Sequence, residues 1–252
     1  MKAPVREVDR ILAQVIALHK EHGIEDLRLF KSLVSAEQYR RHYYKVSEYV
    51  PGGSTVLDWG CGAGHFSFGL AALGYKTYGY GFYDFELHRF VPDGFHLTLG
   101  ALDDPVSIPF DDGYFDAVVS VGVLEHVRET GGNEPASLRE VHRILRPGGH
   151  FLCFHFPNRL SLMERLNTLL GGEHHHTYKY ARRDIERLCR QAGLDLLEVH
   201  RYGALPRNVW NRLPERLGNS RAAANAYNVA DRLLGFPLSA VCQNYLFVAR
   251  KT

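Results

Sequence analysis

The chain of 252 residues has few of the features that mark secreted, metal-stapled or membrane-spanning proteins. Its four cysteines, at 61, 153, 189 and 242, are widely separated and form no CxxC pair, so no disulfide framework or zinc knuckle is indicated. The apolar run at 11–18 is too short to cross a bilayer, and the acidic Glu7 and Asp9 before it do not suit a secretory leader. We therefore expect a cytoplasmic protein in a reducing compartment, with peripheral membrane contact as an open option.

Strong charge of either sign is also missing. The formal net charge is only +2, and the 45% hydrophobic and 23% charged residues are typical of globular domains. These values argue against disorder and against a chain-wide nucleic-acid binder. A chain of this length fits one large domain and can bury a sizeable core without staples.

Strand and helix patterns alternate through the middle of the chain. Runs rich in Val, Phe and Tyr predict strands, and apolar residues at helical spacing predict the helices between them. The predicted strands are 55–58, 76–80, 95–99, 115–121, 150–156, 194–201 and 243–250, and the predicted helices are 4–21, 35–49, 66–73, 138–145 and 182–192. Ser35 is expected to cap the second helix. The alternation favours an α/β fold built on a largely parallel sheet.

Two stretches, 157–177 and 202–242, interrupt this alternation. Ligands of parallel sheets bind beyond the carboxyl ends of the strands. We expect the two stretches to lie there as a cap that closes over the ligand and selects it.

A glycine-rich turn joins the first predicted strand to its helix. Gly60, Gly62 and Gly64 stand in the string VLDWGCGAGHF at 56–66, where glycine permits a tight turn and the close approach of a ligand. Such a turn is a weak signal that many nucleotide binders share. The dinucleotide pattern GxGxxG is not met because position 65 is histidine, and no Walker-type lysine follows, so dinucleotide enzymes are disfavoured.

Two downstream segments make the signal far more specific. They read IPFDDGYFDAVVSVGVLEHV at 108–127 and LREVHRILRPGG at 138–149. Together with VLDWGCGAG, they resemble the class I S-adenosylmethionine-dependent methyltransferases, in the branch with LPF…FD…VLEHV…LRPGG motifs. The resemblance covers about residues 50–200.

The resemblance implies a Rossmann-like, seven-stranded, mostly parallel sheet with an antiparallel last strand and helices on both faces. An N-terminal helical segment (1–50) would precede a methyltransferase domain (51–252) with a small C-terminal cap insertion. It also implies S-adenosyl-L-methionine as the cofactor and S-adenosyl-L-homocysteine as its product.

The motif positions imply residues for each part of the cofactor. The methionyl part would contact Asp58, Gly60, Cys61 and Gly62, with the Asp58 carboxylate pairing with the ammonium group. Either Asp103 or Asp104 matches the position whose carboxylate accepts from the adenine amino group. Gly122 to His126 would line the methyl-donor side.

The sequence departs from the family at the end of the second strand. An acidic residue normally binds both ribose hydroxyls there, but the matching position is Gly81. Asp84 or Tyr83 is expected to bind the ribose in its place. The departure also leaves an alternative function open, a catalytically inactive cofactor-binding or regulatory protein that kept the methyltransferase fold.

Histidines are the candidate catalytic groups. A hydroxyl acceptor can need a general base, and His126 after the fourth strand and His155 in the fifth are placed to supply one or to pack beside the cofactor. Three adjacent histidines, His174 to His176, do not converge on one ion without a bent backbone, so no metal site is predicted. They are expected to form either an exposed polar loop or a wall of the acceptor pocket.

Arginine is plentiful between 179 and 221, which suits either a solvated surface or recognition of an anion. No RNA-binding module is visible, so a nucleic-acid partner is disfavoured. The segment 180–194 is similar to YxxxDIxxLxxxAGL segments of bacterial enzymes that tailor glycans, lipids or secondary metabolites. We therefore predict methyl transfer to a non-protein acceptor, through a hydroxyl of a glycan, lipid-linked or small-molecule substrate that can be anionic.

Overall fold

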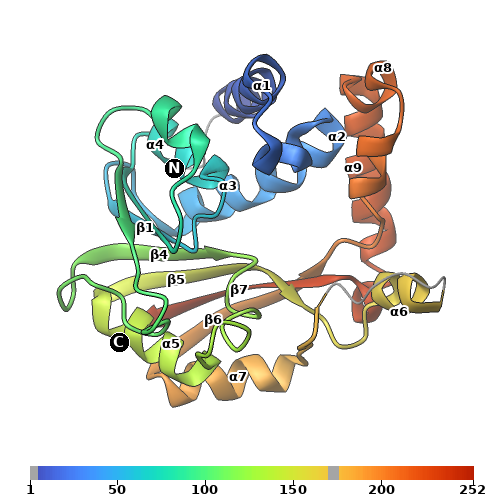
Figure 1. Cartoon of the computed structure of the whole chain (residues 1–252). Coiled ribbons are helices and arrows are strands. Elements are labelled where there is room, and N and C mark those ends of the chain that lie inside the picture. The colour runs from blue at the N-terminus through green and yellow to red at the C-terminus, as the bar shows by residue number, and fades with distance from the viewer. Residues whose placement is uncertain (1–4, 170–175) are drawn as a thin grey trace.

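The computed structural model describes residues 5–169 and 176–252, and within them the chain forms one seven-stranded sheet with helices on both faces (Figure 1). The strand order is β3-β2-β1-β4-β5-β7-β6. The strands are β1 (Thr55–Trp59), β2 (Lys76–Gly81), β3 (His96–Leu99), β4 (Phe115–Val121), β5 (Leu145–Pro157), β6 (Leu194–Tyr202) and β7 (Asn244–Lys251).

The pairing is parallel from β3 to β5, whereas β7 runs antiparallel to both β5 and β6. The expected Rossmann-like sheet with an antiparallel last strand is therefore confirmed. The reversal of order between β1 and β4 creates the crevice in which doubly wound sheets bind ligands.

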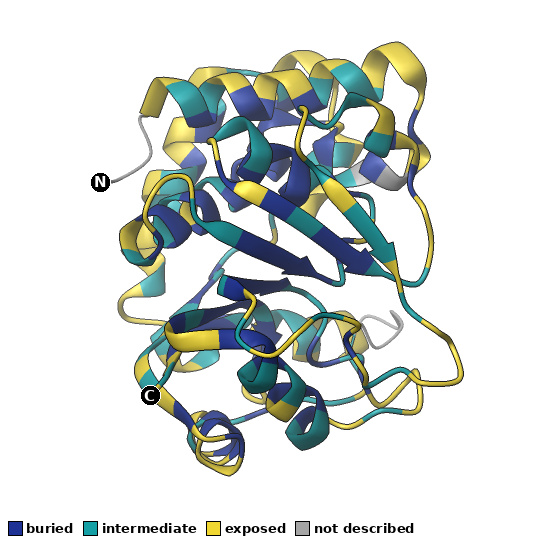
Figure 2. Ribbon diagram, turned by 90° about the vertical axis from the view of Figure 1, so that its left-hand side faces the viewer, coloured by how far each residue is buried: buried dark blue, intermediate teal, exposed yellow. Residues whose placement is uncertain are grey.

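Alternate residues of the central strands enter two separate cores, one on each face of the sheet (Figure 2). Ala117 and Val119 of β4 pack beneath α1 (Val5–His22), α3 (Gln38–Tyr49) and α4 (His65–Ala72), while Val118 packs beneath α5 (Glu134–Ile144) and α7 (Arg182–Gln191). Such strands, apolar on both faces, are characteristic of a buried parallel sheet.

The two stretches outside the alternation form short helices beyond the carboxyl ends of the strands (Figure 1). The first contains α6 (Leu162–Leu169). The second contains the 3₁₀ turn η3 (Asn208–Arg212), α8 (Glu215–Gly218), α9 (Arg221–Gly235) and η4 (Ser239–Val241). We call these helices, together with the residues that connect them, the cap.

The cap is tied to the short helix α2 (Leu33–Ala36) by polar contacts. Arg207 Nη1 donates to the Val34 carbonyl at 2.9 Å, and the Asn219 side chain accepts from the Leu33 N–H at 2.9 Å. Ala224 and Tyr227 of α9 complete a small apolar cluster with Leu33. The N-terminal helices and the cap therefore hold each other in place over the sheet.

Local differences from the predicted boundaries have clear causes. Ser35 is not the N-cap of the second helix: it is buried within α2, whose cap is Ser32, and α3 starts only at Gln38. Helix α5 starts at Glu134 rather than 138 because Asn133 caps it and Pro135 is tolerated in the first turn. Two further 3₁₀ turns, η1 (Glu25–Phe30) and η2 (Glu86–Phe90), complete the described elements. None of the described helices has the length and apolarity needed to cross a membrane.

Candidate active site

A cavity of about 880 Å³ opens where β4 and β5 end. Gly122 and His155 form its floor, Tyr39 of α3 forms one wall, and α6, η3 and the start of β7 form the others. The apolar part of the lining includes Leu29, Val121, Met163, Leu166 and Val209. Both cap stretches therefore line the cavity. That they select the ligand stays a prediction.

The glycine turn packs against the segment after β4, whose Gly122, Glu125 and His126 line the cavity. Gly60, Gly62 and Gly64 all have positive φ, at 74°, 49° and 73°. A Cβ at Gly60 would lie 2.4 Å from a methyl of Val123, and one at Gly64 would lie 1.9 Å from the ring of Phe85. At Gly62 the nearest atom would be 3.9 Å away. Packing thus demands glycine at 60 and 64, while Gly62 faces open space that a ligand can occupy.

Asp58 and Cys61 are buried beside the turn. Ser67 Oγ donates to Asp58 Oδ2 at 2.7 Å, and burial raises the pKa of the Asp58 carboxyl to about 7. A cationic group of a bound ligand would favour the ionised form of the Asp58 carboxyl. The pairing of Asp58 with the cofactor's ammonium group stays a prediction. The Cys61 N–H donates to the Tyr80 carbonyl at 3.0 Å, which joins the turn to the end of β2.

The end of β2 carries the residues expected at the ribose. A Cβ at Gly81 would meet only Cys61 Sγ at 3.6 Å, so the position has room for a side chain that the sequence does not supply. Tyr83 is 72% exposed. Asp84 Oδ1 accepts from the Phe85 N–H at 2.7 Å and lies 3.2 Å from His88 Nδ1. The compensation for Gly81 by Asp84 or Tyr83 is still a prediction.

Asp103 and Asp104 are both exposed in the loop after β3. Asp104 Oδ1 accepts from the Ser107 N–H at 3.2 Å and so stabilises the loop. No hydrogen bond within the described residues engages Asp103. Whether Asp103 or Asp104 accepts from the adenine amino group therefore stays a prediction.

The turn after β4 brings Gly122, Glu125 and His126 to the cavity wall. Gly122 has φ 71°, which re-aims the chain at the strand end. Glu125 is 1% exposed, burial raises the pKa of its carboxyl to about 8, and neither oxygen has a hydrogen-bonding partner in another described residue. His126 Nδ1 lies 2.8 Å from Glu129 Oε2, and Nε2 lies 4.0 Å from Glu125 Oε1. The Glu129 carboxylate thus accepts a hydrogen bond from Nδ1–H of His126, and the lone pair of Nε2 is available to a ligand.

His155 is held in a strained conformation at a bulge in β5. Its φ of 61° is the one positive value at a non-glycine position in the described ranges, and the β5–β7 register shifts around it. Tyr202 Oη accepts from the His155 N–H at 2.8 Å and lies 3.3 Å from Nδ1, and it also lies 3.3 Å from His42 Nε2. Bulges and strained residues are frequent at functional sites, where they direct a side chain.

The His155 ring remains neutral near pH 7. Burial lowers the pKa of its imidazole to about 3. Its Nε2 has no hydrogen-bonding partner among the described residues, although His155 lines the cavity. The predicted candidates His126 and His155 thus both line the cavity, and the neutral His155 ring offers its Nε2 to a ligand.

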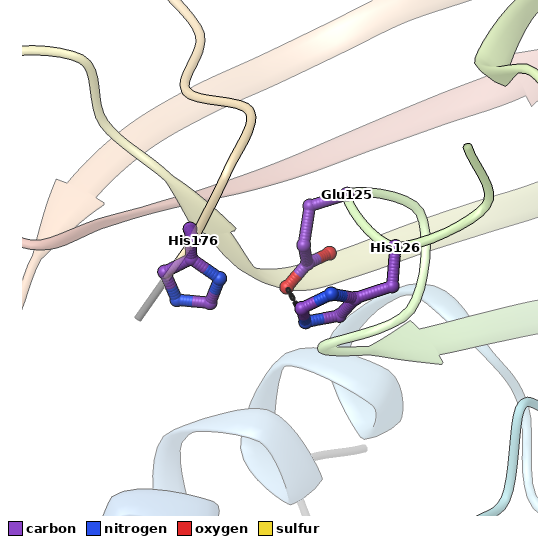
Figure 3. Close-up of side chains that lie close together, drawn as sticks. All are labelled: Glu125, His126 and His176. Carbon is purple, nitrogen blue, oxygen red and sulfur yellow. Dashed lines mark ion pairs between the residues drawn. The ribbon is translucent and has the colours of Figure 1, made fainter. Parts of the chain in front are cut away.

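Two further contributors come from segments that the sequence had placed only broadly. Glu125 lies within 122–126, the segment expected on the methyl-donor side, but neither Glu125 nor His176 was named as a site residue. His176 comes from the segment between α6 and α7 and points toward Glu125 and His126 (Figure 3). The rest of the histidine triplet, His174 and His175, lies outside the described residues.

The arginines expected to bind an anion serve mainly other purposes. Arg207 is committed to Val34, to the Asn228 side chain at 2.8 Å and to the ring of Tyr227. Arg212 lies at the exposed edge of the cavity. The described arginines thus give weak support to a strongly anionic acceptor.

Comparison with known proteins places this geometry in a family. Residues 31–199, which include the glycine turn and the β4 and β5 segments, match the family described as "Methyltransferase domain". A 2-phytyl-1,4-naphtoquinone methyltransferase from Nostoc punctiforme is 33% identical over 123 residues, which are 44% of this chain and 50% of that protein. The chain therefore spans about half the length of that relative.

Further relatives cover more of the chain. A ubiquinone biosynthesis O-methyltransferase from Burkholderia pseudomallei is 27% identical over 186 residues, 68% of this chain and 76% of that protein. Among solved structures, a SAM-dependent methyltransferase from Archaeoglobus fulgidus shares the fold with a TM-score of 0.55 at 18% identity, covering 85% of this chain and 91% of that one. The family match, the sheet order and the glycine turn agree, and the chain belongs to the S-adenosylmethionine-dependent methyltransferases, with S-adenosylmethionine as its cofactor.

Proposed function

We propose that this methyltransferase transfers the methyl group to a hydroxyl on an aromatic acceptor that carries an apolar substituent and binds in the cavity. The observation that carries the proposal is the cavity itself. Its walls are largely apolar, while Glu125 and His155 contribute buried polar atoms without partners in other described residues. Such atoms in a native protein call for a ligand or water, and apolar pockets with a few polar groups are typical of small-molecule sites.

The cavity also lies where the methyl group would be presented. Gly60 packs against Val123, so the glycine turn adjoins the segment that carries Gly122, Glu125 and His126. A donor held on the turn would have its sulfonium beside Gly122. The acceptor oxygen would then approach the methyl carbon from the cavity side, the in-line geometry that the displacement needs.

The residues at the cavity suit the bond changes of O-methylation. The acceptor oxygen forms a bond to the methyl carbon while the sulfur–carbon bond breaks, and sulfur leaves with the bonding pair as a neutral thioether. The hydroxyl must lose its proton in the process, and we assign this to the Glu125–His126 side of the cavity. His155, neutral near pH 7, would orient the oxygen through a hydrogen bond at Nε2.

The relatives support the acceptor class. One is named an O-methyltransferase of ubiquinone biosynthesis, and another a methyltransferase of a phytyl-substituted naphthoquinone. Both names refer to quinones, and the phytyl group in the second is a long apolar substituent. A phosphorylated sugar or glycan is less well served, because Arg207 already donates to the Val34 carbonyl of α2 and to the Asn228 side chain of α9.

We extend the proposal to a lipid surface as the source of the acceptor. Leu169 at the end of α6 is 80% exposed and Phe236 after α9 is 90% exposed, and both belong to the cap. Apolar side chains there would contact the surface of a bilayer. We expect the protein to sediment with phospholipid vesicles into the pellet, and a Leu169→Glu/Phe236→Glu variant to stay in the supernatant.

The acceptor proposal is tested with methyl-labelled S-adenosylmethionine. The enzyme is incubated separately with an alkyl-substituted dihydroxybenzene and with a phosphorylated sugar, and the products are identified by mass spectrometry and carbon NMR. We expect a methoxy product from the dihydroxybenzene alone. Methylation at carbon or nitrogen, or preference for the phosphorylated sugar, would contradict the proposal.

A further inference from the structure

We infer that Glu125, His126 and His176 form a binding site for one divalent transition-metal cation that faces the acceptor cavity. One ligand atom from each residue, a carboxylate oxygen and two imidazole nitrogens, can be chosen so that all lie within 4.8 Å of one another (Figure 3). All three residues also line the cavity. The inference rests on the proposed function for its acceptor but not for its ligands.

The Glu125 carboxylate is the first reason to expect a cation. It is 1% exposed, and its oxygens accept no hydrogen bond from another described residue. His126 Nε2 lies 4.0 Å from Glu125 Oε1, beyond hydrogen-bonding distance. A buried carboxylate without donors is costly, and a bound cation between Glu125 and the two imidazoles would remove that cost.

The support of His126 is the second reason. Its Nδ1 lies 2.8 Å from Glu129 Oε2, so Nδ1 donates its proton to that carboxylate and Nε2 keeps a free lone pair. Imidazoles that bind metals are commonly oriented in this way by a carboxylate on the opposite nitrogen. Glu129 therefore has the role of a positioning residue.

The donor set indicates which cations fit. Two imidazole nitrogens and one carboxylate oxygen suit Zn²⁺, Mn²⁺, Fe²⁺ or Co²⁺ better than Mg²⁺ or Ca²⁺, which prefer oxygen ligands alone. Three protein ligands leave coordination positions open, as in catalytic sites. These positions would face the cavity, where an acceptor can enter.

The present geometry is slightly wider than that of a loaded site. Metal–ligand distances near 2.1 Å in a tetrahedral site place ligand atoms about 3.4 Å apart, so the side chains must approach one another by about an ångström. His126 has 38% of its side chain exposed, and the ring of His176 lies 5.5 Å from that of His126. Ring rotations at these two residues can supply the movement.

A cation here would deepen the proposed reaction. An acceptor hydroxyl bound to it becomes more acidic, because the positive charge stabilises the oxyanion. The proton passes to water, His126 acts as a ligand rather than as a base, and the oxyanion attacks the methyl carbon. Two adjacent hydroxyls could occupy two open positions at once, which would favour vicinal diols of the aromatic class.

The site is tested on the untagged full chain by metal analysis without any acceptor. Protein treated with chelator is incubated with ZnCl₂ or MnCl₂, passed over a desalting column and analysed for bound metal. We expect one equivalent in the wild type and a Zn²⁺ affinity weakened about 10- to 100-fold by Glu129→Gln, and by more in Glu125→Gln. The control is His200→Gln, which removes a histidine paired with Glu198 at 3.0 Å on β6 and should leave binding unchanged.

The outcomes separate the site from the proposed function. No bound metal in the wild type, or undiminished binding by Glu125→Gln, would overturn the site; the second result would mean that the histidine run alone holds the ion. Stoichiometric binding that needs Glu125, with no methylation of any hydroxyl, would support the site and refute the function. Undiminished hydroxyl methylation by metal-free enzyme would overturn the cation's part in the reaction.

Discussion

Replacement of Gly62 by leucine separates cofactor binding from folding. At φ 49° a leucine can adopt the left-handed conformation at a cost of roughly 1–2 kcal/mol. No protein atom lies within 3.4 Å of the added Cβ, the nearest being the Gly60 carbonyl oxygen at 3.9 Å. The side chain must therefore extend into the open space that the cofactor's methionyl part is expected to fill. We expect affinity for S-adenosylhomocysteine to fall by about 100-fold or more, equivalent to about 2.7 kcal/mol.

The matched control is Gly53→Leu. Gly53 precedes β1 at the opposite end of that strand from the glycine turn, has φ 79°, and offers equally open space. Each variant should lower the melting temperature by about 2–8 °C, because 1 kcal/mol corresponds to about 2–4 °C in a domain of this size. The backbone cost is thus shared, and only the binding cost differs.

Scanning fluorimetry and calorimetry together measure both effects. Ligand at a hundred times its Kd stabilises the protein that binds it by about 2.7 kcal/mol, or about 5–11 °C. We expect that thermal shift in the wild type and in Gly53→Leu, and at most about 1–2 °C in Gly62→Leu at the same concentration, which then about equals its Kd. Wild-type affinity in Gly62→Leu would refute the placement of the cofactor on the turn.

Three further predictions concern the ribose, the cap and the buried histidines. Asp84→Asn keeps the hydrogen bond from the Phe85 N–H but loses the carboxylate charge; we expect calorimetry to show roughly tenfold weaker cofactor binding, and an unchanged affinity would rule out Asp84 at the ribose. Val209→Asp at the cavity wall should raise the KM for an apolar acceptor at least tenfold without changing cofactor affinity. The control Leu233→Asp, at an exposed residue outside the cavity lining, should change neither quantity. Equal effects of the two variants would argue against acceptor selection by the cap. Burial holds the pKa of His42 well below 6.5, so the unfolded chain binds a proton that the folded chain does not, and stability falls as pH drops below 6.5. His42→Phe should reduce the slope of the unfolding free energy against pH between pH 4.5 and 6, by up to about 1.4 kcal/mol per pH unit. Urea titration at several pH values measures this slope, and equal slopes in the two proteins would contradict the assignment.

Most of the fold could be predicted from the local pattern of apolar residues and glycines in the sequence. The strand at Phe115–Val121 matches its predicted bounds because a run of apolar residues with aromatic and β-branched side chains has few other stable placements in an α/β sheet. The glycine turn could also be predicted, because the sequence has glycine at 60 and 64, where a Cβ would clash with Val123 and Phe85. Those contacts themselves come from distant segments, and the sequence alone does not reveal them.

The site was less predictable because it is built from long-range placement. His176 joins Glu125 and His126 across about 50 residues, and judging the histidine triplet by itself led to the prediction of no metal. The strain at His155 arises from its pairing with Tyr202 and the bulge between β5 and β7. Ser35 was predicted as a helix N-cap because serine favours that position. Ser32 is the N-cap of α2 instead, and the Ser35 hydroxyl donates to the side chain of Asn208 in η3.

The most direct test of the account is a structure of the chain with S-adenosylhomocysteine bound. We predict that the homocysteine part lies against Gly62 and that the sulfur sits beside Gly122, facing the cavity that Glu125 and His155 line. In that arrangement a methyl group on the sulfur would point at an acceptor in the cavity. A ligand bound away from the glycine turn, or a sulfur separated from the cavity by protein atoms, would contradict the account.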